Sequence, residues 1–545
     1  MMRFRFSTPG RNLPLAAAIL FCCSFAVAWF WLIESRAVAA TRPNVVLIQV
    51  DDMSKNLLRS EYRDPKRGRW VPAMPNLLKQ VAGRGVEFSN YYVSDPICGP
   101  SRASLLTGRA THNHGMKINV PPFGYPFWQN SQISQENLPV WLERAGYRTI
   151  HVGKYFNGYG ADPQDEVPAG WDRFISPTNR TSSYYGNPLN INGQVTPPIG
   201  DWQVRDDPGC VVATIDTPGF CTHSTDLQTA YAVDEIAKSS TDLNPFYLQL
   251  DYNAPHDDGR RADGPEPPAR LRPISHRTDP PGSLGNRPVS PAQPQFIRGQ
   301  APLAPDMQAE IRERWGNEVA SVKGVDEGIG RILDQLEVYG MMENTYVIFT
   351  SDNGMFHGEH RIQYGKFLPH EPSTRQPLIM RGPGLPANRS TTALSSNLNL
   401  ASTVLTMTGV GDGAALDGGS LIGFARHPRQ PNRVPVLLEG FNGLDPALPE
   451  PFLDGGGQKR PNQAVVLNYT GLVSDNWKYV AYSYGEEELY NLAADPGEMR
   501  NLAAVPRYAR ITAWGRKQAA RLATCLGPEC RLEVQAPRLP RPGSD

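Results

Sequence analysis

Short apolar runs alternate with longer amphipathic segments along most of this chain. The runs are rich in Val, Ile and Leu, which is typical of strands buried on both faces of a parallel sheet. Strands are predicted over 44–50, over 86–88 together with 90–93 as a single strand, and over 148–152, 245–250 and 346–350. Apolar residues at helical spacing predict helices over 74–82, 138–145 and 309–339. Repeated strand–helix alternation predicts an α/β fold with a large, mostly parallel sheet flanked by helices.

The pattern changes in two interior stretches and again near the C-terminus. Residues 179–219 and 259–305 are rich in Gly, Pro and polar residues and show no clear periodicity, so both are predicted to be long loops. We expect the second loop to border the substrate cleft. After residue 430, short strands over 434–439, 464–468 and 477–483 and a helix over 507–523 predict a small antiparallel sheet with a helix. The predicted division is a catalytic domain over 41–430 and a C-terminal subdomain over 431–545.

The first forty residues resemble an export signal. Arg3, Arg5 and Arg11 precede an apolar run over 13–33, and Ala37-Val38-Ala39 fits a small-residue cleavage site. The run is also long enough to cross a bilayer of about 30 Å, so a retained membrane anchor is the alternative. Either interpretation places the body of the protein outside the cytoplasm.

Composition limits the classes of partner. The 545 residues contain 54 Lys and Arg and 54 Asp and Glu, so nothing in the charge indicates a nucleic-acid partner. Seven cysteines occur, two of them in the apolar leader. If Cys98 is kept for chemistry, the remaining four form two sequence-close couples, Cys210 with Cys221 and Cys525 with Cys530. Local disulfides in an oxidising compartment are the simplest expectation, and other connectivities stay open.

Acidic residues end two of the predicted strands. Asp51 and Asp52 follow the run at 44–50, and Asp352 and Asn353 follow the run at 346–350. Ligands of open α/β sheets bind beyond the carboxyl ends of the strands, where these side chains are expected to meet. Three carboxylates at one edge would repel each other unless a cation lay between them. Oxygen ligands favour Ca²⁺ or Mg²⁺ over zinc.

The segment from Cys98 to Arg109 predicts an anion site with a nucleophile. Pro100 is suited to the first turn of a helix, which places Cys98 at the helix N-terminus. Backbone N–H groups and the helix dipole favour negative charge there, and Arg102 adds a positive charge. The simpler interpretation, a buried structural cysteine, does not account for the acidic strand ends.

The Cys98-Gly99-Pro100-Ser101-Arg102 sequence, followed by Thr107-Gly108, resembles the signature of the type I sulfatases. The resemblance covers about residues 42–532 and implies the alkaline-phosphatase/sulfatase-like fold. It implies that a formylglycine-generating enzyme oxidises Cys98 to formylglycine, whose hydrated aldehyde attacks a sulfate ester. It also implies a metal, usually Ca²⁺ with Mg²⁺ as the alternative, held by Asp51, Asp52, Asp352, Asn353 and the residue at position 98.

The same resemblance assigns roles to three further basic residues. Lys154, Lys366 and His256 match the family's sulfate-binding lysines and substrate histidine, and together with Arg102 they would neutralise the sulfate. His112 and His114 are interpreted as structural support. The chain departs from the family at Phe156, where many sulfatases carry a histidine of a Gly-Lys-x-His motif. The identity of the general base is therefore open, with Asn157 or another histidine as candidates for the orienting role.

The surrounding motifs point to one branch of the family. Gly153-Lys154-Tyr155-Phe156-Asn157 and the segment Cys525 to Cys530 resemble the N-acetylglucosamine-6-sulfatases and their extracellular endosulfatase relatives. The resemblance implies a sulfated carbohydrate such as the 6-sulfate of N-acetylglucosamine in a glycosaminoglycan. An aryl sulfatase and a phosphate or phosphonate monoester hydrolase are the alternative enzymes, although lysines stand where phosphatases carry ligands for a second metal. A sulfated-glycan binding protein with an unmodified cysteine is the non-enzymatic alternative.

Overall fold

A computed structural model describes residues 42–64, 68–161, 163, 165–178, 183–200, 222–258, 264–272, 280, 286–411, 413–441 and 468–538. The predicted leader and the couple Cys210 with Cys221 lie outside these residues. Residues 43–545 form one compact unit. No helix among the described residues is both long enough and apolar enough to cross a membrane.

A ten-stranded sheet forms the centre of this unit, in the order β14-β4-β13-β11-β1-β10-β6-β7-β8-β9. The strands are β1 (Asn44–Val50), β4 (Val86–Phe88), β6 (Arg148–Gly153), β7 (Arg173–Pro177), β8 (Leu189–Ile191), β9 (Gln194–Val195), β10 (Phe246–Asp251), β11 (Thr345–Ser351), β13 (Leu378–Arg381) and β14 (Arg389–Thr391). The five central strands, from β11 to β7, run parallel to one another. The predicted mostly parallel α/β sheet is confirmed.

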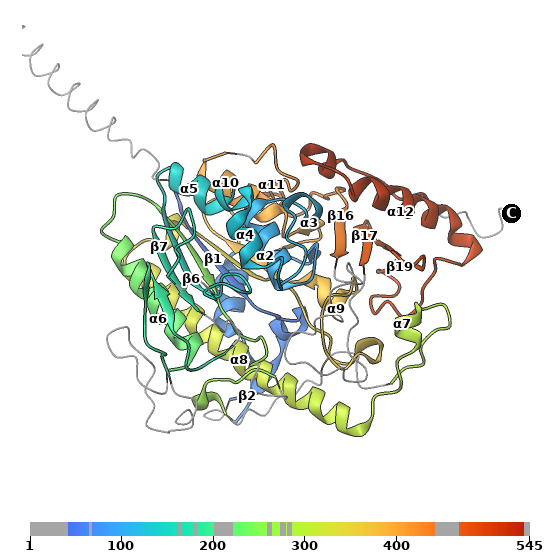
Figure 1. Cartoon of the computed structure of the whole chain (residues 1–545), viewed down its shortest axis with the longest axis horizontal. Helices are drawn as coiled ribbons and strands as arrows, with labels where there is room; N and C mark the ends of the chain where they lie inside the picture. Colours follow the sequence, from blue (N-terminus) through green and yellow to red (C-terminus); the bar gives the residue numbers. More distant parts are fainter. Residues whose placement is uncertain are drawn as a thin grey trace, which may run out of the picture. The chain divides into compact units, whose positions relative to one another are not determined.

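Helices cover both faces of the sheet (Figure 1). The α-helices of the described residues, not all of which lie on this sheet, are α2 (Cys98–Thr107), α3 (Thr111–His114), α4 (Tyr125–Asn130), α5 (Leu138–Arg144), α6 (Ser224–Ser239), α7 (Gln295–Arg298), α8 (Pro305–Val338), α9 (Glu371–Thr374), α10 (Asn399–Thr408), α11 (Ile422–Arg426) and α12 (Ala509–Leu522). Side chains of a strand alternate between the faces. Val45 and Leu47 therefore join a core with α2, α5 and α10, while Val46 and Ile48 join a second core with α6 and α8.

A four-stranded antiparallel sheet follows residue 430, as expected. It consists of β16 (Val436–Phe441), β17 (Asn468–Ser474), β18 (Trp477–Tyr482) and β19 (Glu487–Asn491). Leu472 and Tyr479 of this sheet share a separate hydrophobic cluster with Ile511 and Leu522 of α12. A disulfide joins Cys525 to Cys530, which confirms one of the two expected local pairs. The domain boundary near residue 430 remains a prediction.

Two expectations about local structure need correction. The polar stretch 179–219 is not all loop, because β8 and β9 extend the large sheet by hydrogen bonding to β7 and to each other. The single strand predicted over 86–88 and 90–93 is divided, because its second part forms β5 (Tyr91–Tyr92), which pairs with β12 (Arg375–Gln376) and β15 (Ser395–Ser396) in a separate small sheet. Strand partners so distant in the sequence cannot be identified from local periodicity.

Candidate active site

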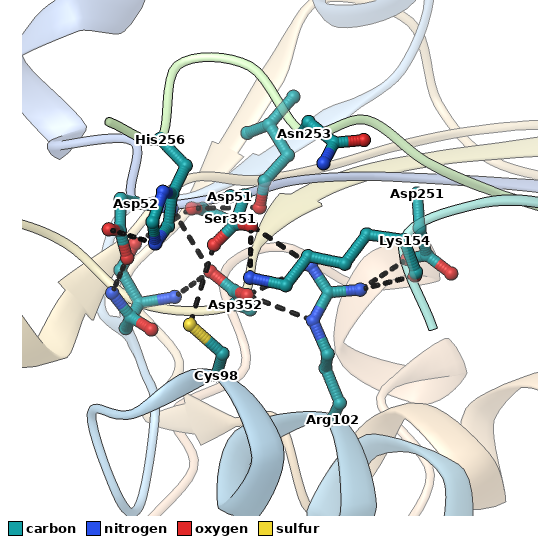
Figure 2. Close-up of polar contacts among 12 residues, drawn as sticks. Asp51, Asp52, Cys98, Arg102, Lys154, Asp251, Asn253, His256, Ser351 and Asp352 are labelled. Carbon is teal, nitrogen blue, oxygen red and sulfur yellow. Dashed lines mark hydrogen bonds and ion pairs between the residues drawn. The ribbon is translucent and has the colours of Figure 1, made fainter. Parts of the chain in front are cut away.

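The carboxyl ends of three adjacent strands bring the acidic residues together (Figure 2). Strand β1 lies between β10 and β11, with Val50 opposite Ser351 and Gln49 opposite Asp251. The chain leaves β1 at Asp51 and Asp52 and leaves β11 at Asp352 and Asn353. Parallel register therefore places residues separated by 300 positions at one edge of the sheet.

Hydrogen bonds hold this acidic edge in a defined arrangement. The backbone N–H of Asp52 donates to Oδ1 of Asp352 (3.1 Å), and Nδ2 of Asn353 donates to Oδ1 of Asp52 (2.5 Å). Asp52 has a left-handed backbone conformation with φ of 63°, which is uncommon for a residue with a side chain. Asp51, Asp352 and Asn353 are fully buried. The conformation of Asp52 directs two consecutive carboxylates into the same enclosed space.

Cys98 faces this space from the first residue of α2. Its Sγ lies 3.5 Å from Oδ1 of Asp51 and accepts a hydrogen bond of 3.0 Å from the ammonium of Lys366. Burial, followed by the negative charge of Asp51, raises the pKa of the Cys98 thiol. The backbone N–H of Gly99 donates to Oδ1 of Asn119 (2.7 Å), so this side chain caps the start of the helix. Cys98 is free of disulfides and completely buried.

Arg102 and Lys154 neutralise the carboxylates on one side. The Arg102 guanidinium lies 2.9 Å from Oδ2 of Asp352 and 3.4 Å from Oδ1 of Asp251, and it also donates to the carbonyl of Lys154 (3.0 Å). The Lys154 ammonium donates to Oδ2 of Asp51 (2.5 Å). Because both cations are buried with their partners, water screens these interactions weakly.

Lys366 and His256 face the acidic residues from other segments. Lys366 follows a hairpin closed by the backbone hydrogen bond from Phe356 to Gly365, and its ammonium lies 2.6 Å from Oδ1 of Asp52. Nε2 of His256 lies 3.5 Å from Oδ2 of Asp52. Nδ1 of the same ring donates to the carbonyl of Asp257 (2.8 Å), which fixes the orientation of the imidazole.

The enclosed charges shift the pKa of the two central carboxyl groups in opposite directions. Burial opposes ionisation of Asp51, but Lys154 and His256 outweigh this effect and lower its pKa. Burial and the adjacent charge of Asp51 raise the pKa of Asp352 despite its contact with Arg102. The ionised form of Asp352 is therefore disfavoured in this enclosure, and a bound cation would stabilise it.

The residues fit a divalent cation of the calcium or magnesium type. Asp51, Asp52 and Asp352 offer carboxylate oxygens, and Oδ1 of Asn353 is buried without a hydrogen-bond partner. One ligand atom each from Asp51, Asp52, Cys98 and His256 lies within 4.8 Å of the others. A set made chiefly of oxygen atoms suits a hard cation, since zinc sites are built from nitrogen and sulfur.

The structure brings all nine predicted site residues into this one enclosure. Figure 2 shows Asp51, Asp52, Cys98, Arg102, Lys154, His256 and Asp352. The other two are Asn353, which donates to Asp52, and Lys366, which contacts Asp52 and Cys98. Sequence reasoning missed Asp251, which ends β10 and contacts both Arg102 and His151. The sequence did contain a signal for this residue, because Asp251 follows an apolar run as Asp51 does.

Phe156 and the two histidines after α2 are part of the supporting structure. Phe156 is completely buried, with its ring 4.6 Å from that of Trp128, so it cannot act on Cys98. His256 is the histidine that shares the cluster with Cys98. His112 contacts Oε1 of Glu439 (2.5 Å) and the carbonyl of Cys525 (2.9 Å), and His114 contacts Ser104 (3.0 Å). His112 therefore ties α3 to β16 and to the C-terminal segment, and His114 ties α3 to α2.

Comparison with known proteins gives consistent matches over most of the chain. The sequence model described as "Sulfatase" matches residues 43–410. An arylsulfatase of Volvox carteri is 30% identical over 536 residues, covering 91% of this chain and 76% of the relative. The N-acetylglucosamine-6-sulfatase of Homo sapiens is 26% identical over 526 residues, covering 91% and 87% of the two chains.

A solved structure shares the fold. It contains a protein in complex with its substrate, D-glucosamine-2-N,6-O-disulfate, and superposes with a TM-score of 0.63. The two sequences are 22% identical, and the match covers 88% of this chain and 97% of the other. The predicted sulfatase-like architecture is thus confirmed at the level of the whole fold.

Proposed function

The chain belongs to the sulfatase family and is a sulfuric ester hydrolase, and from this premise we propose that it cleaves the 6-O-sulfate of N-acetylglucosamine or a related carbohydrate sulfate. We further propose that Cys98, oxidised to formylglycine by a formylglycine-generating enzyme, is the nucleophile, and that the cation is Ca²⁺. The observation that supports this most directly is the position of Cys98 between the acidic edge and Lys366.

The formylglycine would supply, as its hydrate, one hydroxyl that attacks sulfur and a second through which the sulfate is later released. The cation would be held by Asp51, Asp52, Asp352 and Asn353 and would supply positive charge to the sulfate oxygens. Position 98 lies at the N-terminus of α2, where backbone N–H groups favour developing negative charge. Splitting the hydrolysis into two steps lowers each barrier.

The basic residues bind the sulfate and balance its charge. Lys154 and Lys366 hold fixed ammonium groups beside position 98, and Arg102 orients Asp352. The charge that builds on the sulfate oxygens in the transition state is stabilised by such preorganised cations. His256 acts as the general acid in its imidazolium form: Nδ1–H stays bound to the carbonyl of Asp257, and the second proton passes from Nε2 to the leaving alcohol oxygen, which leaves a neutral ring.

The sugar assignment is supported by the family relatives and by the C-terminal motif. The human N-acetylglucosamine-6-sulfatase matches nearly the whole chain, and Cys525-Leu526-Gly527-Pro528-Glu529-Cys530 forms a closed loop through its disulfide. The same disulfide supports the proposal that the protein is exported, since such bonds persist in oxidising compartments. A second candidate, an aryl sulfatase, is favoured by the 30% identity to the Volvox enzyme.

A substrate panel distinguishes these candidates. Enzyme produced with a formylglycine-generating enzyme is assayed on N-acetylglucosamine 6-sulfate, galactose 6-sulfate, 4-nitrophenyl sulfate and the monoester 4-nitrophenyl phenylphosphonate, with Cys98→Ala as the matched inactive control. We expect the highest kcat/KM on N-acetylglucosamine 6-sulfate. A higher value on 4-nitrophenyl sulfate than on every sugar would replace the carbohydrate assignment with the aryl one. Turnover confined to 4-nitrophenyl phenylphosphonate would overturn the assignment to sulfate.

A further inference from the structure

A large cavity lies apart from the nine residues of the candidate active site. It has a volume of about 410 Å³ and is walled by five segments of the chain, residues 54–56, 286–289, 358–361, 371–375 and 496–499. None of the nine site residues lines it. Its size falls within the usual range for ligand pockets, about 300–1,000 Å³. The C-terminal part of the chain contributes one wall, through Pro496, Gly497, Glu498 and Met499.

Two of these walls continue directly from the catalytic segments. Ser54 and Lys55 follow Asp52 after one intervening residue. Residues 358–361 form the end of the hairpin that the Phe356–Gly365 bridge closes, and Lys366 follows that bridge. A ligand in the cavity would therefore contact two segments that also carry active-site residues. One segment carries Asp52, a proposed metal ligand, and the other carries Lys366, which is proposed to bind the sulfate.

The backbone around the cavity is unusual. Asn286, His360, Arg361 and Glu498 line it and have positive φ values of 40°, 54°, 64° and 55°. These are four of the nine non-glycine residues with positive φ in the described part of the chain. Such conformations cost free energy and concentrate at functional sites, so packing alone is a poor explanation for four of them around one cavity.

Two cations, Lys478 and Arg375, neutralise the acidic side chains that line this part of the cavity. Glu371 and Glu498 both pair with the buried ammonium of Lys478, at 2.8 Å and 2.7 Å. The Arg375 guanidinium pairs with the second oxygen of Glu371 (3.0 Å). Two glutamates thus share two cations, and this part of the wall carries no net charge.

The remaining charge of the wall is positive. Lys55, Arg287 and Arg361 face a single further carboxylate, Glu359. Lys55 is partly buried, donates to the carbonyl of Ser89 (2.6 Å) and forms no ion pair within the described residues. Burial, with a smaller contribution from Arg375, lowers the pKa of Lys55 to about 8. An ammonium that is desolvated without a carboxylate partner is stabilised when an anion arrives.

We propose that this cavity binds an acidic sugar, sulfated or carboxylated, in the same oligosaccharide as the unit whose sulfate is cleaved. The anionic group of this sugar binds Lys55 and Arg287, and Arg361 adds positive charge to the same wall. The inference rests on the proposed function and extends it, because it makes a sulfated oligosaccharide a better substrate than a single sulfated sugar. Two walls of the cavity continue along the chain from the segments that carry Asp52 and Lys366, and the proposal is that one oligosaccharide spans both places.

The test compares a long and a short substrate in matched variants. The kcat/KM is measured on N-acetylglucosamine 6-sulfate and on a size-defined heparin tetrasaccharide for the wild type and for the double variant Lys55→Gln, Arg287→Gln. We expect the ratio of tetrasaccharide to monosaccharide kcat/KM to fall about tenfold, mainly through KM, which corresponds to about 1.4 kcal/mol. Lys55→Arg with Arg287→Lys keeps the charges and should keep the ratio.

Arg59→Gln is the control for simple loss of charge. Arg59 lies in the same 3-10 helix as Lys55 (η1, Lys55–Arg59), is exposed and pairs with Glu87 without lining the cavity. Its substitution should leave the ratio unchanged. An unchanged ratio in the double variant, or an equal fall in Arg59→Gln, would overturn the proposal.

A binding measurement separates failure of this inference from failure of the proposed function. The affinity for the tetrasaccharide is measured by calorimetry on Cys98→Ala, with and without the double substitution. If the wild type desulfates no sugar, the carbohydrate function is wrong, yet a weaker affinity in the substituted protein still supports the acidic-sugar site. Equal affinities in the two proteins would exclude it.

Discussion

The ammonium of Lys366 lies 3.0 Å from the sulfur of Cys98, although the two residues are 268 positions apart in the chain. The same ammonium lies 2.6 Å from Oδ1 of Asp52. One cation therefore contacts both the proposed nucleophile and a proposed metal ligand. This position is suited to binding a sulfate oxygen between the metal and the nucleophile.

Replacing Lys366 by methionine tests this role. We expect Lys366→Met to lower kcat about 10²- to 10³-fold, because one preorganised positive charge is lost at the developing charge of the transition state. Steady-state kinetics on the best substrate of the panel measure this effect. Lys79→Met, an exposed lysine on another segment, is the control and should stay within about twofold of the wild type. A comparable kcat for Lys366→Met would exclude a direct contact with the sulfate.

The state of Cys98 can be read directly by mass spectrometry. Trypsin is expected to release the peptide from Gly85 to Arg102. We expect this peptide, from protein made with a formylglycine-generating enzyme, to carry –CHO in place of –CH₂SH at position 98. Protein made without that enzyme supplies the unmodified reference. An intact thiol in the first sample would contradict the formylglycine mechanism and favour a non-catalytic glycan-binding protein.

Metal removal should abolish activity. Substitution of Asp352 and substitution of Asp251 should differ in their effect on metal content. Asp352 belongs to the acidic edge, whereas Asp251 holds Arg102 and His151. We expect Asp352→Asn to lose the metal, as measured by elemental analysis, and Asp251→Asn to keep it while losing activity. Dialysis against a calcium chelator should inactivate the wild type, and Ca²⁺ should restore it. Full activity in metal-free protein would overturn the metal assignment.

Acid should destabilise the protein through His114. Burial, with smaller effects of His112 and Arg109, lowers the pKa of His114 to about 3. The unfolded chain takes up a proton near pH 6.5 that the folded state does not, so the unfolded state gains stability as pH falls below that value. This group alone should cost about 2 kcal/mol between pH 7 and pH 5.

The comparison with His114→Gln isolates this contribution. Denaturant unfolding at pH 7 and pH 5 should show a larger loss of unfolding free energy for the wild type than for the variant, by about 2 kcal/mol. Equal losses would show that His114 does not cause the acid sensitivity. A change in the opposite direction would contradict the neutral, buried state of the ring.

Lys478 should stabilise the attachment of the C-terminal sheet to the rest of the chain. Its ammonium, on β18, pairs with Glu371 and Glu498 in a fully buried position. We expect Lys478→Met to lower the free energy of unfolding by about 3–5 kcal/mol, because two buried carboxylates lose their cation. Lys517→Met on the exposed surface of α12 is the control. Adding Glu498→Gln to Lys478→Met should recover part of the loss, and no recovery would argue against the ionic explanation.

The local hydrophobic pattern predicted the central strands and helices because the residues within each of these elements favour its secondary structure. Strand β1 is a nearly unbroken apolar run, and α8 shows helical spacing over most of its length. The same rules failed for β8 and β9, which are short and contain Asn190 and Gln194. Those strands exist because β7 offers them an edge to pair with. Pairing partners lie outside any local window of sequence.

The candidate site was predictable to the extent that chemistry and position coincide in a local motif. Asp51 and Asp352 end apolar strands, and Cys98 precedes a proline at a helix start. Asp251 has the same signal and lies only five residues before His256, but the resemblance assigned no role to it. The five-walled cavity and the pairing of Lys478 with two glutamates have no sequence signal, since their members come from segments that meet only after folding.

The residue types at strand ends and helix starts could be identified from the amino-acid sequence alone, and they indicate the kind of chemistry that the protein carries. Hydrophobic runs and helix-starting residues act over a few positions, so local rules can read them. The contacts between charged side chains, in contrast, depend on the tertiary fold. Lys366 reaches Asp52 across 314 residues because the strand register and the packing of the hairpin fix that distance. Whether a buried charge is neutralised depends on such contacts, and no pattern along the chain encodes them.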